Sequence, residues 1–334
     1  MKFIRYIAFP LVPIYYLVTW LRNKLYDLSI KKSVSYGFPV ICVGNLSFGG
    51  TGKTPMIEYL INFLKDDYRV ATLSRGYKRK TEGFQIADKT SNSNSIGDEP
   101  FQFYNKFKNS ITVAVDADRQ HGIKSLQKLQ PKPNIILLDD AFQHRKVKAG
   151  FNILLTTYAS PYFNDMVLPT GSLREPKSGA KRAHIIIVTK CPENLDETEK
   201  KVILKKIKPK TYQQVFFSSI SYSNTVVSSN SVNSINSFDA FTLVTGIANA
   251  TPLVNFLKGK KLKFEHLNYK DHYDFTPNDI IELNKKEVII TTEKDFMRLK
   301  QYESLKEKLF YLPITVKIDN DNSFNKLITD FIMH

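Results

Sequence analysis

The chain has 334 residues, of which 42% are hydrophobic and 24% are charged, an ordinary globular composition that excludes a disordered or fibrous protein. Its length favours two lobes of roughly 150 residues each. Because 48 Lys and Arg outnumber 32 Asp and Glu, the net charge is +16, which leaves nucleic acid, anionic lipid and phosphorylated substrates as candidate partners. Cys42 and Cys191 stand in different segments, so the sequence predicts neither a disulfide framework nor a zinc site, and we expect Cys42 to be a buried core thiol.

The first predicted element is an N-terminal helix region, residues 1–32. Within it, Ile7–Leu21 carries no charge and has basic flanks, but it is shorter than the about 20 residues that cross a bilayer and contains two prolines. No small-residue cleavage site follows, which argues against a signal peptide. We therefore predict a helix lying in the membrane interface, with Tyr15, Tyr16 and Trp20 at headgroup depth. An ordinary helix packed on the body of the protein is the alternative.

Short apolar runs then alternate with helical stretches. Most runs are continuous, as is typical of strands buried on both faces of a parallel sheet, and their order predicts a doubly wound α/β domain over residues 33–217. The Ser- and Asn-rich residues 218–238 are predicted to be a linker or a pair of exposed strands, and residues 239–334 a smaller α/β lobe. The predicted strands are Phe38–Val43, Arg69–Leu73, Ile111–Val115, Asn134–Leu138, Asn152–Leu155, His184–Val188, Phe241–Val244, Glu287–Ile290 and Leu309–Ile314.

A glycine-rich turn follows the first of these strands and precedes a helical stretch. This order is typical of a phosphate-binding loop, because glycines let backbone N–H groups close around phosphate and the helix N-terminus adds partial positive charge. Lys53 would bind the β- and γ-phosphates of a nucleotide, and the Thr54 hydroxyl a Mg²⁺ ion. Ser47 stands where the full pattern has glycine. The predicted nucleotide-binding residues are Ser47, Phe48, Gly49, Gly50, Thr51, Gly52, Lys53 and Thr54.

Two carboxylates, Asp139 and Asp140, directly follow the apolar run Ile135–Leu138. They should therefore lie at the carboxyl edge of the sheet, where ligands bind in open α/β folds. One of them can hold Mg²⁺ or its water shell. Together with the glycine-rich turn, the pair predicts a magnesium–nucleotide site.

At this point the sequence resembles the tetraacyldisaccharide 4'-kinases of lipid A synthesis. The resemblance runs from about residue 38 to 300, and six or more motifs in fixed order are far more specific than a phosphate loop alone. Ala141, where glycine is common, and Tyr273, where a second histidine is frequent, depart from the family pattern. The motifs are Val43-Gly44-Asn45-Leu46, Gly49-Gly50-Thr51-Gly52-Lys53-Thr54-Pro55, Ser74-Arg75-Gly76-Tyr77, Gly97-Asp98-Glu99-Pro100, Asp139-Asp140-Ala141-Phe142-Gln143-His144, Leu168-Pro169 with Leu173-Arg174-Glu175-Pro176, and Thr292-Glu293-Lys294-Asp295.

The resemblance implies an ATP- and Mg²⁺-dependent kinase that phosphorylates the 4'-hydroxyl of a tetraacylated glucosamine disaccharide 1-phosphate, forming lipid IVA. It also implies a peripheral or monotopic position on the cytoplasmic face of the bacterial inner membrane, which agrees with the prediction for the N-terminal helix. A strongly basic chain suits a phosphorylated lipid on an anionic surface. No obligate protein partner is indicated, and no nucleic acid is expected.

The resemblance also suggests roles for individual residues. Asp98 would be the base that accepts the proton of the attacking hydroxyl, with His272 as its partner and Asp271 supporting the histidine; a helix N-cap is the alternative for Asp98. Glu99 would join Asp139 and Asp140 around Mg²⁺. The candidates for binding substrate or phosphate are Arg174, as a two-pronged clamp, Glu175, Gln143, His144, Arg75 and Arg119. A structural histidine is the alternative for His144, and a solvated surface position is the alternative for Arg75 and Arg119.

Two other kinds of function compete with a glycolipid kinase. The positive charge and 12% aromatic residues are compatible with a phosphate-loop ATPase acting on nucleic acid, but the basic residues are scattered and no known nucleic-acid module is present. A membrane-associated nucleotide sensor without transfer activity is the other alternative. The presence of Lys53, Asp98 and Asp139 argues against an inactive site of that kind.

Overall fold

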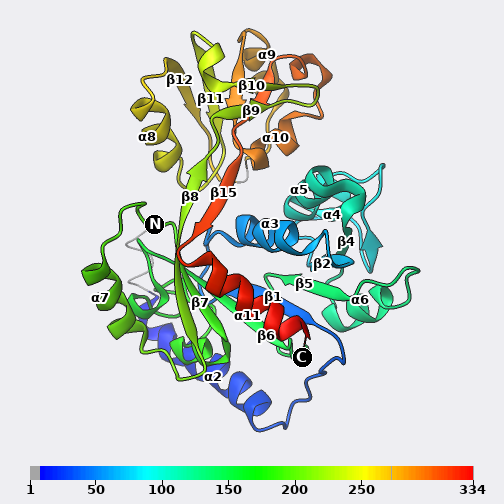
Figure 1. Cartoon of the computed structure of the whole chain (residues 1–334), viewed down its shortest axis with the longest axis vertical. Coiled ribbons are helices and arrows are strands. Elements are labelled where there is room, and N and C mark those ends of the chain that lie inside the picture. Colours follow the sequence, from blue (N-terminus) through cyan, green and yellow to red (C-terminus); the bar gives the residue numbers. More distant parts are fainter. Residues whose placement is uncertain (1–7, 272, 334) are drawn as a thin grey trace.

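The computed structural model describes residues 8–271 and 273–333. A large α/β body lies below a smaller α/β domain, and two long strands run between them (Figure 1). The helices are α2 (Val12–Asp27), α3 (Lys53–Leu64), α4 (Ser93–Ile96), α5 (Asp98–Phe107), α6 (Arg119–Leu126), α7 (Glu197–Ile207), α8 (Thr251–Gly259), α9 (Pro277–Asn284), α10 (Glu293–Leu299) and α11 (Asp321–Met333).

The large sheet has the strand order β15-β8-β7-β6-β1-β5-β2-β4-β3. Its neighbours from β8 to β4 are parallel, while β3 and β15 pair antiparallel at the two edges. The strands are β1 (Val40–Asn45), β2 (Val70–Ser74), β3 (Gln85–Ile86), β4 (Thr112–Val115), β5 (Ile135–Asp139), β6 (Phe151–Thr157), β7 (Ile185–Thr189), β8 (Gln214–Tyr222) and β15 (Ile314–Ile318).

Both faces of this sheet are buried, which explains the continuous apolar runs. Along β1, Val40 and Cys42 point into one core, and Ile41 and Val43 point into the other. Helices α3, α5 and α11 cover the second face, and α6 and α7 contribute to the first. The body is therefore a parallel-rich α/β sheet with helices on both sides, as predicted, and the Cys42 thiol is buried as expected.

The smaller domain contains a second sheet in the order β10-β9-β14-β13-β11-β12. Strands β12, β11, β13 and β14 are parallel, and β9 and β10 add an antiparallel edge. The strands are β9 (Thr225–Val227), β10 (Val232–Ser234), β11 (Phe241–Thr245), β12 (Phe264–Asn268), β13 (Ile289–Thr291) and β14 (Leu309–Tyr311).

The connection between the two parts differs from the expected division. Residues 218–238 do not form a loose linker: β8 enters them from the large sheet, and β9 and β10 pair within them, with Val226 of β9 fully buried. The run Leu309–Ile314 is two strands in different sheets, because Pro313 separates β14 from β15 and cannot donate to a ladder. The chain then returns to the body, where Phe324 and Ile328 of α11 are fully buried.

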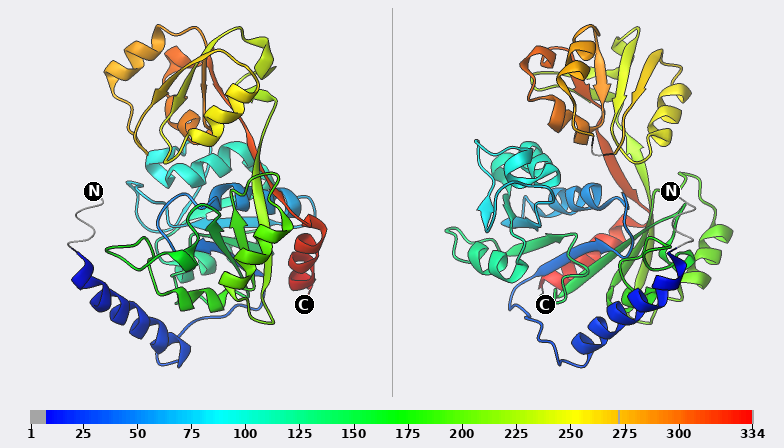
Figure 2. Two further views of the ribbon diagram at one scale, coloured as in Figure 1. Left: turned by 90° about the vertical axis from the view of Figure 1, so that its left-hand side faces the viewer. Right: turned by 180° about the vertical axis from the view of Figure 1, so that it is seen from behind.

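Helix α2 lies along the large body (Figure 2), and among its residues Asn23 is buried while several apolar side chains are exposed. On the inner side, Tyr15 Oη donates to the Arg174 carbonyl at 3.0 Å, and Asn23 Nδ2 donates to Glu175 Oε2 at 2.6 Å. Tyr15 therefore faces the protein, which corrects its predicted place among lipid headgroups; Tyr16 and Trp20 are exposed. Within residues 8–271 and 273–333, no helix combines the length and the apolar character needed to span a bilayer.

Candidate active site

The glycine-rich turn lies between the end of β1 and the first residue of α3. Gly49 and Gly52 have φ angles of 112° and 86°, a region that residues with side chains rarely adopt. Two polar contacts hold the turn: Asn45 Nδ2 donates to Thr51 Oγ1 at 2.8 Å, and Thr189 Oγ1 donates to the Thr51 carbonyl at 2.8 Å. The ends of β1 and β7 thus set the shape of a loop whose amides lead into a helix N-terminus.

The missing glycine at position 47 has a structural explanation. Ser47 forms a β-bridge with Leu173, and the Phe48 amide donates to the Ser172 carbonyl at 2.8 Å. Ser47 pairs as a strand residue does and lies outside the tight part of the turn, so a side chain is tolerated there. The Phe48 ring is exposed, and the Arg174 guanidinium lies 5.6 Å from its centre.

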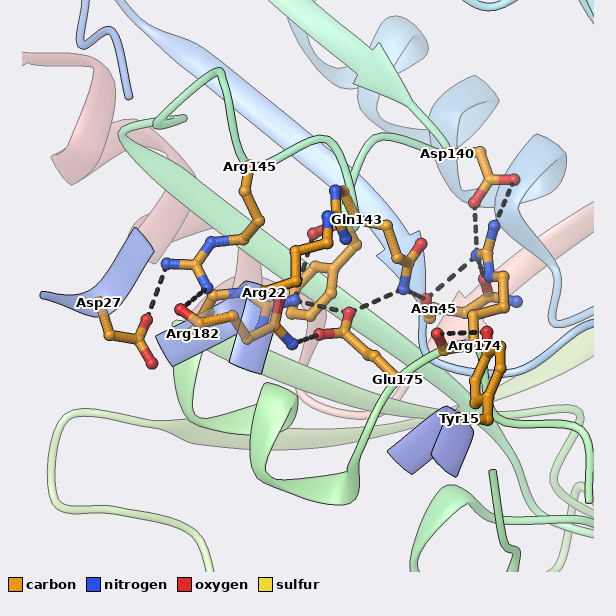
Figure 3. Close-up of polar contacts among 12 residues, drawn as sticks. Tyr15, Arg22, Asp27, Asn45, Asp140, Gln143, Arg145, Arg174, Glu175 and Arg182 are labelled. Atoms are coloured by element: carbon orange, nitrogen blue, oxygen red, sulfur yellow. Dashed lines mark hydrogen bonds and ion pairs between the residues drawn. The ribbon is translucent and has the colours of Figure 1, made fainter. Parts of the chain in front are cut away.

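Asp140 contacts Arg174, as Figure 3 shows, and also the loop lysine, Lys53. Lys53 Nζ is 3.7 Å from Asp140 Oδ1, while Arg174 Nη1 and Nη2 contact the two carboxylate oxygens at 3.3 and 2.7 Å. Arg174 also donates to the carbonyl and side-chain oxygens of Asn45. Burial raises the pKa of Asp140, but Lys53 and Arg174 outweigh this effect, so the pKa lies below its usual value. Asp140 is therefore an anion that orients both cations.

Asp139 is in a different environment from its neighbour. It is buried at the end of β5, and burial together with the Asp140 charge raises its pKa to about 7. Ser74 Oγ donates to Asp139 Oδ2 at 3.3 Å, while the buried Oδ1 has no hydrogen-bond partner among the described residues. A buried, unsatisfied carboxylate oxygen of this kind suits a hard cation, which would favour the ionised form.

The predicted three-carboxylate magnesium site is not preformed. Within the described part of the chain, no three His, Cys, Asp or Glu side chains gather closely enough to hold a metal ion. Glu99 instead lies 3.5 Å from Lys294 of α10, and Asp140 is engaged by Arg174. Asp139 is thus the carboxylate whose surroundings best fit a direct ligand.

Two of the predicted phosphate-binding residues are structural. Glu175 is only 1% exposed and accepts hydrogen bonds from Asn23, Gln143 and Arg182, so it cannot reach a substrate. Arg119 is 2% exposed, and its Nη1 donates to the Asp116 carbonyl at 2.7 Å. Both predictions were wrong for the same reason: charged groups behind the site were assigned to its surface.

The remaining candidates of that group lie around the end of β5 and β2. Gln143 Nε2 donates to the Asn45 carbonyl at 2.8 Å and to the Glu175 carboxylate, so it connects the end of β1 to the buried Glu175. Burial and the nearby Arg119 lower the pKa of His144 to about 4, so its ring is neutral near pH 7. Arg75 is exposed just beyond β2.

The predicted base, Asp98, is the first residue of α5. Its side chain does not cap the helix. Arg298 Nε, from α10 of the smaller domain, donates to Asp98 Oδ2 at 3.2 Å, and Arg298 Nη2 contacts the same oxygen. Sequence reasoning missed Arg298; the available signal was its position one helical turn after Asp295 in the Thr292–Asp295 motif. The predicted partner, His272, lies outside the described residues.

Asp271 belongs to the smaller domain, and its charge affects Lys190, which directly follows β7 of the body. It is exposed at the rim of a cavity of about 820 Å³. Burial lowers the pKa of Lys190, and the charge of Asp271 opposes that shift. Lys190 Nζ in turn lies 3.7 Å from where a Cβ on Gly50 would be. The loop after β12 thus approaches the glycine-rich turn.

Comparison with known proteins identifies the family. A family model described as tetraacyldisaccharide-1-P 4'-kinase matches residues 4–333. A tetraacyldisaccharide 4'-kinase of Flavobacterium johnsoniae is 49% identical over 338 residues, covering 99% of this chain and 98% of that protein. One from Bacteroides thetaiotaomicron is 42% identical over 351 residues, covering 97% and 92%.

A solved structure agrees with these matches. The crystal structure of LpxK from Aquifex aeolicus, described as an "apo" form in complex with ATP, has a TM-score of 0.78 and 31% identity, covering 98% of this chain and 99% of that one. Sequence and fold are thus both shared over almost the entire length. The chain belongs to the tetraacyldisaccharide-1-P 4'-kinase family.

Proposed function

We propose that this protein transfers the γ-phosphate of ATP to the 4'-hydroxyl of a tetraacylated glucosamine disaccharide 1-phosphate, forming lipid IVA in lipid A biosynthesis. The observation that carries the proposal is the junction of Lys53, Asp140 and Arg174 beside a glycine turn at the start of a helix. Phosphoryl transfer depends chiefly on positioning and charge neutralisation, which such a junction provides. The family membership supports the choice of acceptor.

The nucleotide would bind as in P-loop NTPases. Backbone amides of the turn and the N-terminus of α3 would surround the phosphates, with Lys53 on the terminal pair. Thr54 and Asp139 would hold Mg²⁺, which neutralises charge on the phosphates when bound. Arg174 would leave part of its contact with Asp140 to bind phosphate oxygens, since a guanidinium accommodates two acceptors at once.

The acceptor hydroxyl would be deprotonated by Asp98. In this scheme its carboxylate takes the proton as the oxygen attacks, with His272 and Asp271 from the smaller domain in supporting roles. Asp98 belongs to α5 of the body, and the loop carrying Asp271 belongs to the smaller domain, so the acceptor would bind between the two. Approach of the domains would then assemble the site.

We place the protein on the cytoplasmic face of the inner membrane, bound through α2 as a monotopic protein. The outer side of α2 exposes Ile14, Leu17, Val18 and Leu21. Beside it lies an apolar cavity of about 530 Å³ lined by residues of α2 with Leu168 and Pro169. Exposed apolar side chains and a net charge of +16 both favour an anionic lipid surface. A nucleic-acid ATPase, the earlier alternative, is not favoured because it leaves this apolar surface unexplained.

The test is phosphate transfer from γ-labelled ATP to a tetraacyl disaccharide 1-phosphate in detergent micelles, comparing the wild type with Lys53→Ala. We expect labelled bis-phosphorylated lipid from the wild type and at least about 100-fold less from the variant, as expected when a residue that stabilises transferring charge is removed. No labelled lipid from a folded wild type that binds ATP would refute the acceptor assignment.

A further inference from the structure

The contact between Arg298 and Asp98 joins the smaller domain to the start of α5. Both Arg298 nitrogens that contact Asp98, Nε and Nη2, donate to the same oxygen, Oδ2. The Arg298 side chain is 8% exposed and that of Asp98 19%, so the pair is largely shielded from water. Two charge-assisted donors on one oxygen hold the Asp98 carboxylate by Oδ2.

Arg298 is itself held from the interior of the smaller domain. Asp295, one turn earlier in α10, is fully buried and lies 3.6 Å from Arg298 Nη1. Asp295 accepts from the Gly246 amide at 2.8 Å and from Thr292 Oγ1 at 2.7 Å. The Arg298 side chain is therefore held through Asp295 by residues at the ends of β11 and β13, and it does not rotate freely at the surface.

Other charged contacts fix α5 against α10 around this pair. Lys106 of α5 contacts Glu293 at 3.0 Å, Lys294 lies 3.5 Å from Glu99, and Lys300 contacts Asn105. Among residues 8–271 and 273–333, the charged groups that face Asp98 and Arg298 include Glu99 on α5, and Lys294 and Asp295 on α10. The orientation of Asp98 depends on docking of the smaller domain.

We propose that Arg298 is a positioning residue for phosphoryl transfer: it holds the Asp98 carboxylate by Oδ2 so that the acceptor hydroxyl meets a fixed base only when the smaller domain is docked. The inference rests on the proposed function, in which Asp98 is the base. A lysine is a poor substitute, because a single ammonium cannot reproduce the planar two-point contact of a guanidinium.

The experiment is a double-mutant cycle on the transfer reaction with Arg298→Met, Asp98→Asn and the double variant. We expect Arg298→Met to lower kcat by about 100-fold, the effect of a misplaced reacting group, with the KM for ATP changed less than about threefold. The double variant should be no slower than Asp98→Asn, because Arg298 acts through Asp98. Arg298→Lys, the milder change, should recover about tenfold over Arg298→Met.

Lys300→Met is the matched control, since it removes another contact between α10 and α5 without touching Asp98, and it should retain near-normal kcat. Thermal unfolding of every variant shows whether it still folds. If Arg298→Met does not fold, kcat of Arg298→Lys is compared with that of the wild type instead. Two outcomes would overturn the positioning role of Arg298 and leave Asp98 as the base. One is a loss of kcat in the double variant equal to the product of the two single losses; the other is a normal kcat in Arg298→Met while Asp98→Asn is slow. A normal kcat in Asp98→Asn would overturn the role of Asp98 as the base as well. An inactive wild type would overturn the proposed reaction itself.

Discussion

Two adjacent carboxylates at the end of β5 have opposite protonation behaviour. Asp140 contacts Lys53 and Arg174 and has a lowered pKa, whereas the buried Asp139 has a pKa raised to about 7. The left-handed backbone at Asp140, with φ of 49°, accompanies the change of direction between the two side chains. One acid therefore organises cations, and the other remains a costly buried charge that a bound cation would stabilise.

Replacement of Asp139 tests the energetic cost of burying its negative charge. A carboxyl group whose pKa is higher in the folded state binds more protons there, so stability declines as pH rises from about 4 to about 7. We expect Asp139→Asn, without Mg²⁺, to be more stable than the wild type at pH 8 by about 1–3 kcal/mol, with the gain vanishing near pH 4. Urea unfolding at both pH values measures this, and kinase activity should fall in the same variant. A loss of stability at pH 8 would contradict the raised pKa.

At the scale of elements, the two sides of α2 differ in their contacts with the body. Its inner side is tied to the body by Asn23 and Tyr15, while its outer side leaves Leu17 and Leu21 about half exposed. These leucines are four residues apart and share one face. An isolated exposed leucine needs no explanation, but a row of them beside an apolar cavity indicates an interaction surface.

The double variant Leu17→Glu/Leu21→Glu tests the membrane role of that surface. We expect its affinity for phosphatidylglycerol vesicles to fall by at least about 10-fold, because two leucine side chains can no longer be buried in lipid. Activity on substrate dispersed in detergent should stay near normal. Val202→Glu is the control, since Val202 is an exposed apolar residue on α7 and should bind vesicles like the wild type. Undiminished vesicle binding by the double variant would exclude α2 as the anchor.

At the scale of the whole molecule, a buried ionic cluster joins the body to the smaller domain. Lys106 of α5 contacts Glu58 of α3 at 2.7 Å and Glu293 of α10 at 3.0 Å, and both glutamates are nearly inaccessible. Burial, reinforced by the Glu58 charge, raises the pKa of Glu293 to about 7. One lysine thus compensates two buried carboxylates at the interface.

Removal of that lysine should loosen the interface in a pH-dependent way. Lys106→Met is expected to destabilise the protein by about 2 kcal/mol at pH 8, where Glu293 is ionised, and by less at pH 5, where Glu293 is protonated. Thermal unfolding at the two pH values provides the measurement. Lys65→Met, which breaks an exposed pair with Asp66, is the control and should change stability by less than about 0.5 kcal/mol. An equal loss of stability at pH 8 and pH 5 would contradict the raised pKa of Glu293.

The sequence alone determined the elements whose signals are local. The glycine-rich turn could be located because its glycines and Lys53 are contiguous. The buried parallel strands could be located because both of their faces are apolar. Ordered motifs were sufficient to indicate the family. Only the tertiary structure revealed that Leu309–Ile314 divides between two sheets and that α11 returns to the body.

Pairings between distant side chains were likewise decided by tertiary structure alone. Glu175 and Arg119 resembled substrate ligands in the sequence, but packing placed them beneath the site. The contact of Arg298 with Asp98 spans 200 residues, and no local pattern encodes which charges meet across that separation. Propensity and periodicity act over a few residues, whereas burial and ion pairing depend on how finished elements pack. The glycine-rich turn could therefore be located from the sequence, and its ionic contacts could not.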